Sequence, residues 1–350
     1  MKTVIRNFKS IRHIELDAKR INIIIGEPNV GKSNVLEALS LLGEESYRTS
    51  VLGELSIRYN AMAQLYHKRQ LAEPIFIRHD EARLGILYEF DQNKHTLVYG
   101  NDKGLDRQLR DEAPESYKDT QSYLGYVDAR GSGGYSNTPG RTSLRIARPV
   151  RKYVFINAEL KGDIYSVLIA PHGENLFSTI YHHTELSEAV VEMLAHHDLQ
   201  LVLEQEERTL KVQYVEDNGL VIQLPYHLIA DTLQRAIFYT AAIYSNRNAT
   251  LLFEEPENHS FPGYVKDFAH KVIDDENGNT FFIATHSPYF LETILESADY
   301  DDVSISVAYQ RAHETRLRQL TNSELEEIHD YGTDLFFNLS RYYDTESAAA

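Results

Sequence analysis

The segment GEPNVGKS at residues 26–33 constrains the fold of this chain more than any other feature of the sequence. It matches the pattern GxxxxGK[ST], in which the backbone N–H groups of a glycine-rich turn surround phosphate groups. The apolar run INIII at 21–25 precedes it, and apolar residues at helical spacing follow it over 35–42. A buried strand, a phosphate-binding turn and a helix are therefore predicted in succession.

Two further apolar runs, TLLF at 250–253 and TFFIA at 280–284, also lack any alternation with polar residues. Continuous apolar runs of this length are typical of parallel strands that are buried on both faces. Each run ends where polar residues begin, and α/β sheets bind their ligands beyond the carboxyl ends of their strands. The sequence predicts an α/β fold of the P-loop NTPase type, with a mainly parallel core sheet and helices on both faces.

The phosphate loop supplies the predicted nucleotide-binding residues. They are Gly26, Glu27, Pro28, Asn29, Val30, Gly31, Lys32, Ser33 and Asn34. Lys32 would reach the phosphates as a point charge, and the Ser33 hydroxyl would bind Mg²⁺, so ATP and Mg²⁺ are the expected ligands. An ordinary glycine-rich turn is the alternative interpretation, and the strand and helix on either side argue against it.

The acidic pair in LLFEEPE, Glu254 and Glu255, follows the second apolar run. In a phosphate-loop NTPase, a carboxylate at such a strand end helps to hold Mg²⁺, and a further carboxylate polarises the attacking water. We expect Glu254 in the metal role and Glu255 in the general-base role. Taken alone, the pair would be interpreted as a solvated strand end.

The third polar segment is THSP at 285–288, which follows the third apolar run. His286 at this position could donate a hydrogen bond to a γ-phosphate or to the attacking water. A lone histidine is more often structural or simply exposed, so this role depends on the other two motifs. We predict Glu255, His286 and Lys32 as the catalytic residues.

The order of these motifs resembles that of the ABC-type ATPase heads of chromosome-maintenance and recombination-repair ATPases. The segment at 4–39 and, more weakly, LTNSELEEIHDYGTDLFFNLSRYY at 320–343 look like the bacterial AAA-type ATPases of the overcoming-lysogenization-defect type and their phage-defence and abortive-infection relatives. The resemblance covers about 1–42 and 225–295. It implies that residues 26–33 bind nucleotide and Mg²⁺, that Glu255 is the catalytic glutamate and that His286 is the switch histidine. Glu254 stands where such proteins usually have Asp.

The segment LIADTLQR at 228–235 resembles the family signature LSGGxxQR, which one subunit presents to the γ-phosphate bound by another. Its signature-like residues are Asp231, Thr232 and Arg235. A carboxylate about 5 Å from a γ-phosphate charge would cost roughly 3 kcal/mol per charge pair at an effective dielectric near 20. The other interpretation makes Asp231 a helix N-cap, with Gln234 at the third helical position.

The chain divides into five predicted segments. They are the two parts of the ATPase head at 1–42 and 225–350, a helical insertion with a β-hairpin at 43–100, a flexible Gly/Ser-rich loop at 101–149 and a helical and β lobe at 150–224. Helical spacing over 43–73 and hairpins at 86–100 and 199–224, the latter with a DNG turn at 217–219, support this division. The hairpins are expected in an antiparallel lobe, and the loop is either a plain flexible insert or a lid or partner-binding segment.

Composition narrows the class of protein. The 350 residues carry a formal charge of −17 and contain no cysteine, which excludes disulfides and thiolate metal sites. Neither a signal peptide nor an apolar run of membrane-spanning length is present, so a cytoplasmic protein is expected. The negative charge argues against a protein that coats nucleic acid, although a local basic groove would still allow binding. Candidate residues for such a groove are Lys68, Arg69, Arg78, Arg83 and the basic residues of 141–151.

The expected function is that of an Mg²⁺-dependent ATPase that forms a homodimer or a larger homo-oligomer. By the resemblance, it would regulate a separate effector, a nuclease or a toxin, in phage defence or a toxin–antitoxin-like system. An ATP-gated scaffold with little hydrolysis and a DNA-repair or DNA-maintenance ATPase are the alternatives. Residues 289–350 are too few for a nuclease domain, so no nuclease activity is expected in this chain.

Overall fold

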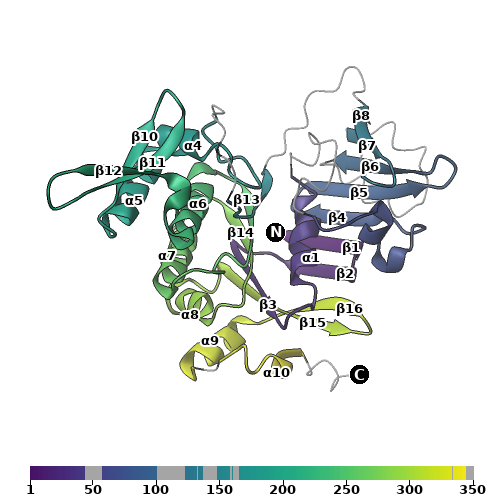
Figure 1. Ribbon diagram of the computed structural model, residues 1–350. Helices are drawn as coiled ribbons and strands as arrows, with labels where there is room; N and C mark the ends of the chain where they lie inside the picture. The colour runs from purple at the N-terminus through teal and green to yellow at the C-terminus, as the bar shows by residue number, and fades with distance from the viewer. Residues whose placement is uncertain are drawn as a thin grey trace.

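Three β-sheets and the helices around them make up the described part of the chain (Figure 1). The computed structural model describes residues 1–43, 57–100, 123–131, 133–136, 148–157, 160, 165–332 and 334–343. None of the described helices is both long and apolar enough to cross a membrane.

The core sheet has six strands in the order β16-β15-β3-β14-β13-β9. Their bounds are β3 Ile21–Gly26, β9 Val150–Tyr153, β13 Thr250–Glu254, β14 Thr280–Ala284, β15 Val303–Arg311 and β16 Glu314–Gln319. All neighbours pair in parallel except β16, which is antiparallel to β15. The three apolar runs of the sequence are adjacent strands of this sheet, as predicted.

Both faces of the core sheet are covered, which explains why its strands are apolar without alternation. Ile23 and Ile25 of β3 belong to one hydrophobic core, and Ile24 belongs to the other. The first core contains helices α4 Leu176–His182, α5 Thr184–Ala195, α6 Asp231–Ser245, α7 Pro262–Ile273, α8 Pro288–Ser297 and α9 Asn322–Asp330. The second contains α1 Lys32–Ser40. A short helix, α10 Ser340–Tyr343, follows α9. The predicted α/β fold is confirmed.

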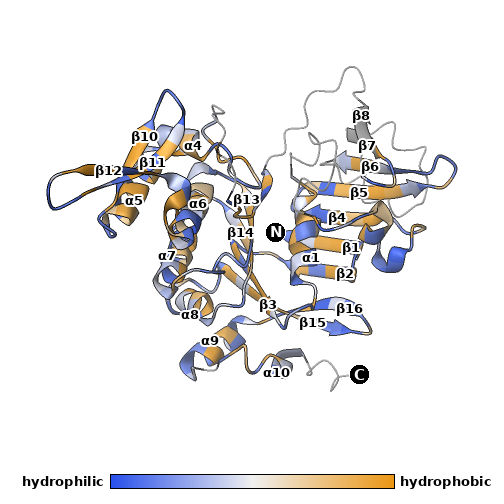
Figure 2. Cartoon of the chain, viewed as in Figure 1, coloured by the Kyte–Doolittle hydropathy of each residue, from blue (hydrophilic) through white to orange (hydrophobic). Residues whose placement is uncertain are grey.

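A seven-stranded antiparallel sheet covers the other side of α1 (Figure 1). Its order is β2-β1-β4-β5-β6-β7-β8, with β1 Lys2–Phe8, β2 Ile11–Asp17, β4 Ile75–His79, β5 Ala82–Glu89, β6 Lys94–Gly100, β7 Tyr123–Val127 and β8 Gly133–Ser136. Figure 2 shows hydrophobic and hydrophilic residues mixed along β1 and β2, because only one face of these strands packs on α1. The hairpin expected at 86–100 is part of this sheet.

A small third sheet contains the hairpin expected at 199–224. Its strands are β10 Gln200–Glu204, β11 Thr209–Val215 and β12 Val221–Pro225, all antiparallel. Gly219 has a φ of +84° in the turn between β11 and β12, and its N–H donates to Glu216 O. The predicted DNG turn is thus confirmed, and it is followed by the third strand.

Three predictions for the middle of the chain need correction. Within 57–73 the structure has only two short 3-10 helices, η2 Met62–Leu65 and η3 His67–Arg69, because Lys68 and Arg69 adopt positive φ angles that end any helix. Residues 44–56 lie outside the described part of the chain.

The segment expected as a loop at 101–149 contains two strands, β7 and β8. Strand β7 pairs with β6, and β8 pairs with β7, without a hydrophobic period in the sequence. The rest of 101–147 lies outside the described residues apart from 128–131. Strand β9, expected in a separate lobe at 150–224, belongs to the core sheet, since Val150 pairs in parallel with Thr250.

Candidate active site

The phosphate loop leaves β3 and enters α1 in a conformation that requires glycine at two positions. Gly26 has a φ of +152° and Gly31 a φ of +97°. A Cβ on Gly31 would lie 2.1 Å from Thr315 Oγ1, and one on Gly26 would lie 2.4 Å from Ala308 O. Both neighbours belong to the β15–β16 hairpin, which therefore closes one side of the loop.

A chain of hydrogen bonds holds the loop in place. Asn34 Nδ2 donates to Ser10 Oγ at 2.6 Å, Ser10 and Thr315 share a hydrogen bond of 2.6 Å, and Thr315 Oγ1 donates to Val30 O at 2.7 Å. Gln310 Nε2 also donates to Asn29 O at 3.0 Å. These contacts fix the loop before any ligand arrives.

Lys32 is buried with its ammonium group against the loop backbone. Its Nζ donates to Gly26 O at 2.9 Å and to Glu27 O at 2.8 Å. Burial lowers the pKa of Lys32, and the nearby carboxylates of Glu255 and Glu254 act against this effect. No carboxylate among the described residues lies within ion-pair distance of Nζ, so an anion such as a phosphate group would supply a missing partner.

Glu254 lies at the carboxyl end of β13, where it meets the phosphate loop. The Ser33 hydroxyl lies beside its carboxylate and helps to lower its pKa. Lys152 Nζ is 2.9 Å from Glu254 Oε2, and Arg58 Nη2 is 3.3 Å from Oε1. Burial alone would raise the pKa of Glu254, but Lys152, the Ser33 hydroxyl and Arg58 outweigh it and lower that pKa. Glu254 is therefore ionised beside the loop, where its oxygens are available to a cation.

Glu255 and His286 face each other at the ends of adjacent strands. His286 Nε2 is 3.5 Å from Glu255 Oε1, and Asn258 Nδ2 donates to Glu255 Oε2 at 2.6 Å. The two side chains are 37% and 36% exposed, so water reaches both. Glu255 has a φ of +46°, and its N–H donates to Ala284 O at 2.8 Å, which fixes this unusual backbone. An exposed carboxylate oriented by an amide and a histidine suits a general base.

Glu257 positions the segment that contains His286. Its Oε1 accepts hydrogen bonds of 2.7 Å from Thr285 Oγ1 and from the backbone N–H of His286. Its Oε2 is buried without a hydrogen-bond partner among the described residues. Burial raises the pKa of Glu257 against the effect of these hydrogen bonds. Burial and the Lys32 charge lower the pKa of His286, while Glu255 acts in the opposite direction.

Comparisons with known proteins fit this geometry. Residues 1–219 match the family model described as the AAA ATPase domain. The chain belongs to this family. As a member it is an ATP-binding ATPase, and the matched range includes the whole phosphate loop. The assignments of Glu254, Glu255 and His286, which lie beyond residue 219, rest on the contacts described above.

Solved structures of SMC heads are similar to this AAA ATPase. The SMC head domain from Thermotoga maritima is 12% identical with a TM-score of 0.43, covering 91% of this chain and 98% of that chain. An Smc head bound to the C-winged helix domain of ScpA is 14% identical with a TM-score of 0.51, covering 92% and 98%. An Smc head domain with an extended coiled coil, bound to the C-terminal domain of ScpA derived from Pyrococcus furiosus, is 13% identical with a TM-score of 0.45, covering 94% and 98%.

The structure with the TM-score of 0.51 supports a shared fold, and identities this low show the fold alone. The predicted fold class, a P-loop NTPase of ABC-ATPase head type, is thereby confirmed. The search of curated proteins gave no match.

The residues of this AAA ATPase fit Mg²⁺ together with a nucleotide. Mg²⁺ is usually held by one or two protein oxygens and by substrate phosphates, with water in its other positions. The Ser33 hydroxyl and the ionised Glu254 carboxylate, already in contact, are such a pair. The positive φ angles of the loop glycines shape a turn of the kind whose backbone N–H groups surround phosphates.

The structure contradicts one of the two interpretations of the signature-like segment. Helix α6 begins at Asp231, its N-cap is Ala230, and no side chain caps it, so the N-cap interpretation of Asp231 is wrong. Instead Arg235 Nε donates to Asp231 Oδ2 at 2.6 Å, and Gln234 is buried with Nε2 donating to Ile229 O. Because Arg235 neutralises Asp231, the repulsion expected between this carboxylate and a phosphate is reduced.

Thr232 and Arg235 contact residues beyond their own helix. Thr232 Oγ1 donates to His259 O at 2.9 Å, in the turn that follows Glu255. The Arg235 guanidinium lies 4.7 Å from the centre of the Phe155 ring. The start of α6 is thus linked to the segment after β13 and to the end of β9.

Four functional residues of the site are absent from the sequence prediction: Arg58, Lys152, Glu257 and Thr315. Arg58 bridges Glu254 and Glu37, since its Nε is also 2.9 Å from Glu37 Oε1. No motif marks Arg58, Lys152 or Thr315. Lys152 and Thr315 reach the site through the pairing of distant strands, and Arg58 reaches it from an irregular segment before η2. Glu257 stands inside LLFEEPE, so its position in the motif was the one available signal.

Proposed function

We propose that this AAA ATPase binds Mg²⁺-ATP at residues 26–33, hydrolyses it with Glu255 as the base and assembles with other copies of itself in the ATP-bound state. The observation that carries the proposal is the convergence of three strand ends. Ser33 contacts Glu254, and Lys32 lies close enough to Glu255 and His286 for their charges to affect each other's protonation.

Each of these residues would have its own role in ATP binding and hydrolysis. Lys32 would turn its ammonium group from the loop carbonyls to the β- and γ-phosphates. Mg²⁺, bound by Ser33 and Glu254, would neutralise charge on the phosphate oxygens. Glu255 would accept the proton of the attacking water, while His286 donates a hydrogen bond to the γ-phosphate. Glu257 would hold His286 at that position through its backbone N–H.

Assembly into a homodimer or larger homo-oligomer is supported by exposed apolar side chains at one end of three helices. Leu228 precedes α6, Phe261 precedes α7, and Tyr289 lies in the first turn of α8; they are 60%, 69% and 47% exposed. Helices α7 and α8 follow the strands that end in Glu254 and Ala284, so these side chains flank the proposed site. A second copy packed there would bury them and exclude water from the nucleotide.

The cellular role that we propose is regulation of a separate effector protein, a nuclease or a toxin, in phage defence or a toxin–antitoxin-like system of the cytoplasm. This role is supported by the residues and the order of the motifs at 4–39 and 251–288, which resemble the motifs of ATPases in such systems. An ATP-gated scaffold is the second candidate, and the observation that favours it is the loss of the signature Ser and Gly residues at Ile229, Ala230 and Asp231. The SMC-head fold also supports a DNA-maintenance ATPase as a third candidate.

Light scattering tests the assembly. The mass of Glu255→Gln should increase to a dimer or more with Mg²⁺-ATP, and the mass of Lys32→Ala should not, because only the former retains ATP. Wild type should assemble transiently and release phosphate. Assembly without any phosphate release would favour the scaffold. A mass of Glu255→Gln that ATP does not change would overturn the proposal of a shared site.

A further inference from the structure

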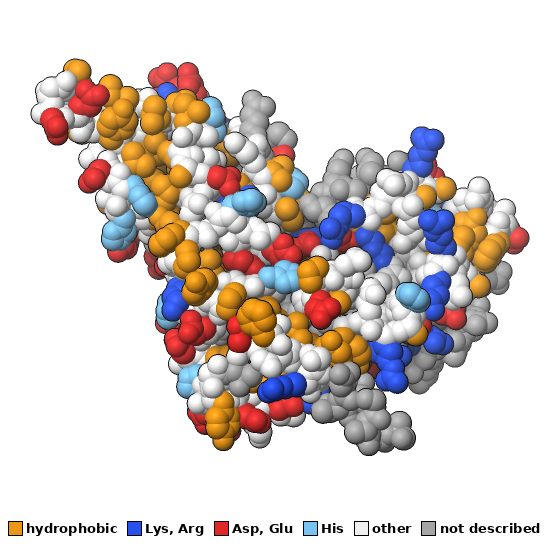
Figure 3. All heavy atoms as spheres, turned by 60° about the horizontal axis from the view of Figure 1, so that its bottom comes forward, with side chains coloured by type: hydrophobic (Ala, Val, Ile, Leu, Met, Phe, Trp, Pro, Cys, Tyr) orange, Lys and Arg blue, Asp and Glu red, His pale blue; other side chains and the backbone are white. Residues whose placement is uncertain are grey.

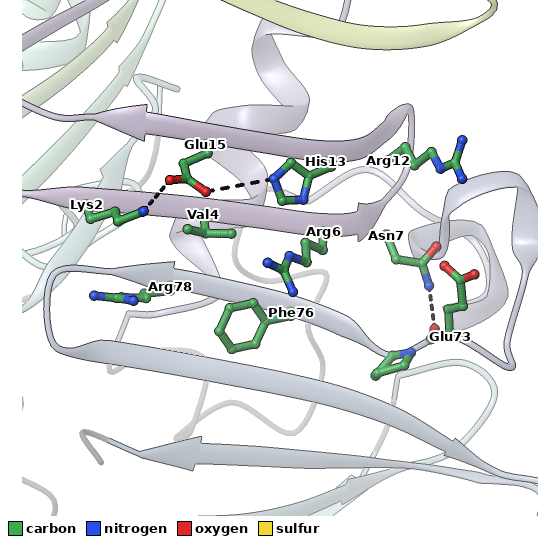
Figure 4. A pocket seen from close by; sticks show the side chains of 11 residues that line it. Lys2, Val4, Arg6, Asn7, Arg12, His13, Glu15, Glu73, Phe76 and Arg78 are labelled. Carbon is green, nitrogen blue, oxygen red and sulfur yellow. Dashed lines mark hydrogen bonds and ion pairs between the residues drawn. The ribbon is translucent and has the colours of Figure 1, made fainter. Parts of the chain in front are cut away.

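A second cavity lies on the seven-stranded sheet, away from the phosphate loop. Its volume is about 650 Å³, and it is formed by β1, β2, β4 and the residues just before β4 (Figure 4). Side chains alternate between the two faces of a strand, and Ile5, Ile14 and Ile77 of these strands point into the core that contains α1. The cavity is therefore on the opposite face of the sheet from α1. We call it the β1–β2–β4 pocket.

Strand register places basic and aromatic residues side by side in this pocket. Arg6 pairs with His13 on one side and with Phe76 on the other. Two residues away, Val4 pairs with Glu15 and with Arg78. In Figure 4, Arg6 lies in the middle of the pocket beside Phe76, with Lys2 and Arg78 toward one end and Arg12 at the other.

Arg6 lacks an acceptor for one of its donors. Its guanidinium carbon lies 5.8 Å from the centre of the Phe76 ring, which holds the group by a cation–π contact. Its Nε is buried, and among the described residues it has no hydrogen-bond partner. A buried charged donor without an acceptor costs free energy, and an anion in the pocket would remove that cost.

The net charge of the pocket lining is positive, although the net charge of the chain is negative. Lys2, Arg6, Arg12 and Arg78 line it together with two carboxylates, Glu15 and Glu73. Lys2 pairs with Glu15, and Arg12 lies 3.9 Å from Glu314. The lining still keeps a surplus of cations on a chain of formal charge −17. Figure 3 also shows Lys and Arg side chains gathered on one side of the molecule.

We propose that the β1–β2–β4 pocket binds a small phosphorylated ligand of nucleotide size, at a site separate from the phosphate loop. Cavities of roughly 300–1,000 Å³ are typical for such ligands, and several Arg and Lys donors along one pocket suit an anion with several oxygens. Phe76 and Val4 supply an apolar floor. The carboxylates of Glu15 and Glu73 repel a continuous phosphate backbone, so a compact ligand fits better than a nucleic acid.

Calorimetric titration of the full chain with pyrophosphate tests this site. The titration uses Lys32→Ala in the absence of Mg²⁺, so that the phosphate loop contributes little. One pyrophosphate per chain should bind, and adding Arg6→Gln should weaken the affinity by about tenfold or more, because it removes a charged donor. Arg247→Gln makes the same charge change on an exposed residue between α6 and β13 and should alter the affinity by less than about twofold.

Lys2→Gln is a second variant for the case in which Arg6→Gln does not fold, as judged by circular dichroism. The Lys2 side chain is 46% exposed at the start of β1. Lys2→Gln should weaken the binding of pyrophosphate, as Arg6→Gln does. The proposal is overturned if pyrophosphate does not bind at millimolar concentration, or if Arg247→Gln has the same effect as the pocket variants. Binding confined to oligonucleotides, and increasing with their length, would also overturn it in favour of a nucleic acid.

Discussion

The Ser33 hydroxyl lies close enough to the Glu254 carboxylate to lower its pKa, although more than two hundred residues separate them in the chain. The contact exists because β3 and β13 flank the same central strand, β14, and run parallel to it. Their carboxyl ends therefore meet at one edge of the core sheet. The two oxygen groups that would bind Mg²⁺ are brought together by the fold itself.

Replacing Gly31 should disable the phosphate loop. Gly31→Ala places a Cβ at a φ of +97° and 2.1 Å from Thr315 Oγ1, so Thr315 must give up its hydrogen bond to Val30 O. We expect ATP binding to be lost and the free energy of unfolding to fall by about 2 kcal/mol or more. Calorimetric ATP titration and urea denaturation measure the two effects.

Gly219→Ala is the matched control for this substitution. Gly219 has a φ of +84°, and nothing lies within 4 Å of the Cβ that alanine would add. Gly219→Ala should lower the free energy of unfolding by about 1 kcal/mol through backbone strain and leave the ATP affinity unchanged. Equal losses for the two variants would show that the contact with Thr315 does not shape the loop.

Removing Lys152 should destabilise the chain in a pH-dependent way. Lys152 lies 2.9 Å from Glu254 and helps to lower the pKa of that carboxyl below its ordinary value of 4.5. Stabilisation of this kind is present above the unfolded pKa and is lost as the pH falls through the folded one. Lys152→Met should therefore cost about 2–3 kcal/mol at neutral pH and less in acid, as measured by urea denaturation.

Lys266→Met serves as the control for Lys152→Met. Lys266 and its partner Glu292 are 46% and 55% exposed, so the substitution should change the free energy of unfolding by less than about 1 kcal/mol at every pH. A cost of Lys152→Met that is no larger than this, or that does not diminish in acid, would refute the assigned role of the ion pair.

The buried carboxyl of Glu257 should make the chain less stable as the pH rises. Its folded pKa lies above its ordinary value of 4.5 because of burial. The unfolded chain then loses this proton more readily, so the contribution is complete below pH 4.5 and is lost as the pH rises through the folded pKa. Glu257→Gln keeps an Oε1 for Thr285 and His286 and does not ionise.

We therefore expect the melting temperature of Glu257→Gln to rise relative to that of wild type between pH 5 and pH 8, without nucleotide. Scanning calorimetry of both proteins at several pH values measures the difference. A constant difference across this range would mean that Glu257 is ionised throughout and that burial does not control its titration.

Local patterns were sufficient to predict three strands of the core sheet, β3, β13 and β14, and the motif residues. Alternate residues of β3 enter two different hydrophobic cores, so the run INIII had to be apolar throughout, and the polar motif residues had to follow at its end. The same argument placed Glu254 and His286 beside the phosphate loop.

The remaining site residues depend on contacts that no local pattern records. Lys152 reaches Glu254 because β9 pairs with β13 across about a hundred residues of chain, and Thr315 reaches the loop because β15 pairs with β3. The 3-10 turns at 62–69 were missed because apolar residues spaced by three or four, such as Met62 and Leu65, pack equally well from irregular backbone. Such residues can be assigned to the site only from the three-dimensional structure.

Phosphate release by wild type and Glu255→Gln, measured together with their ATP affinities, tests the central claim most directly. Glu255→Gln should lower the turnover rate by about 10²–10⁴-fold and leave ATP affinity nearly unchanged, because the base acts only in the chemical step. Glu276→Gln, an exposed carboxylate in the loop after α7, should match wild type in both measurements. Normal turnover by Glu255→Gln would contradict the assignment of the base and, with it, the proposed mechanism of hydrolysis.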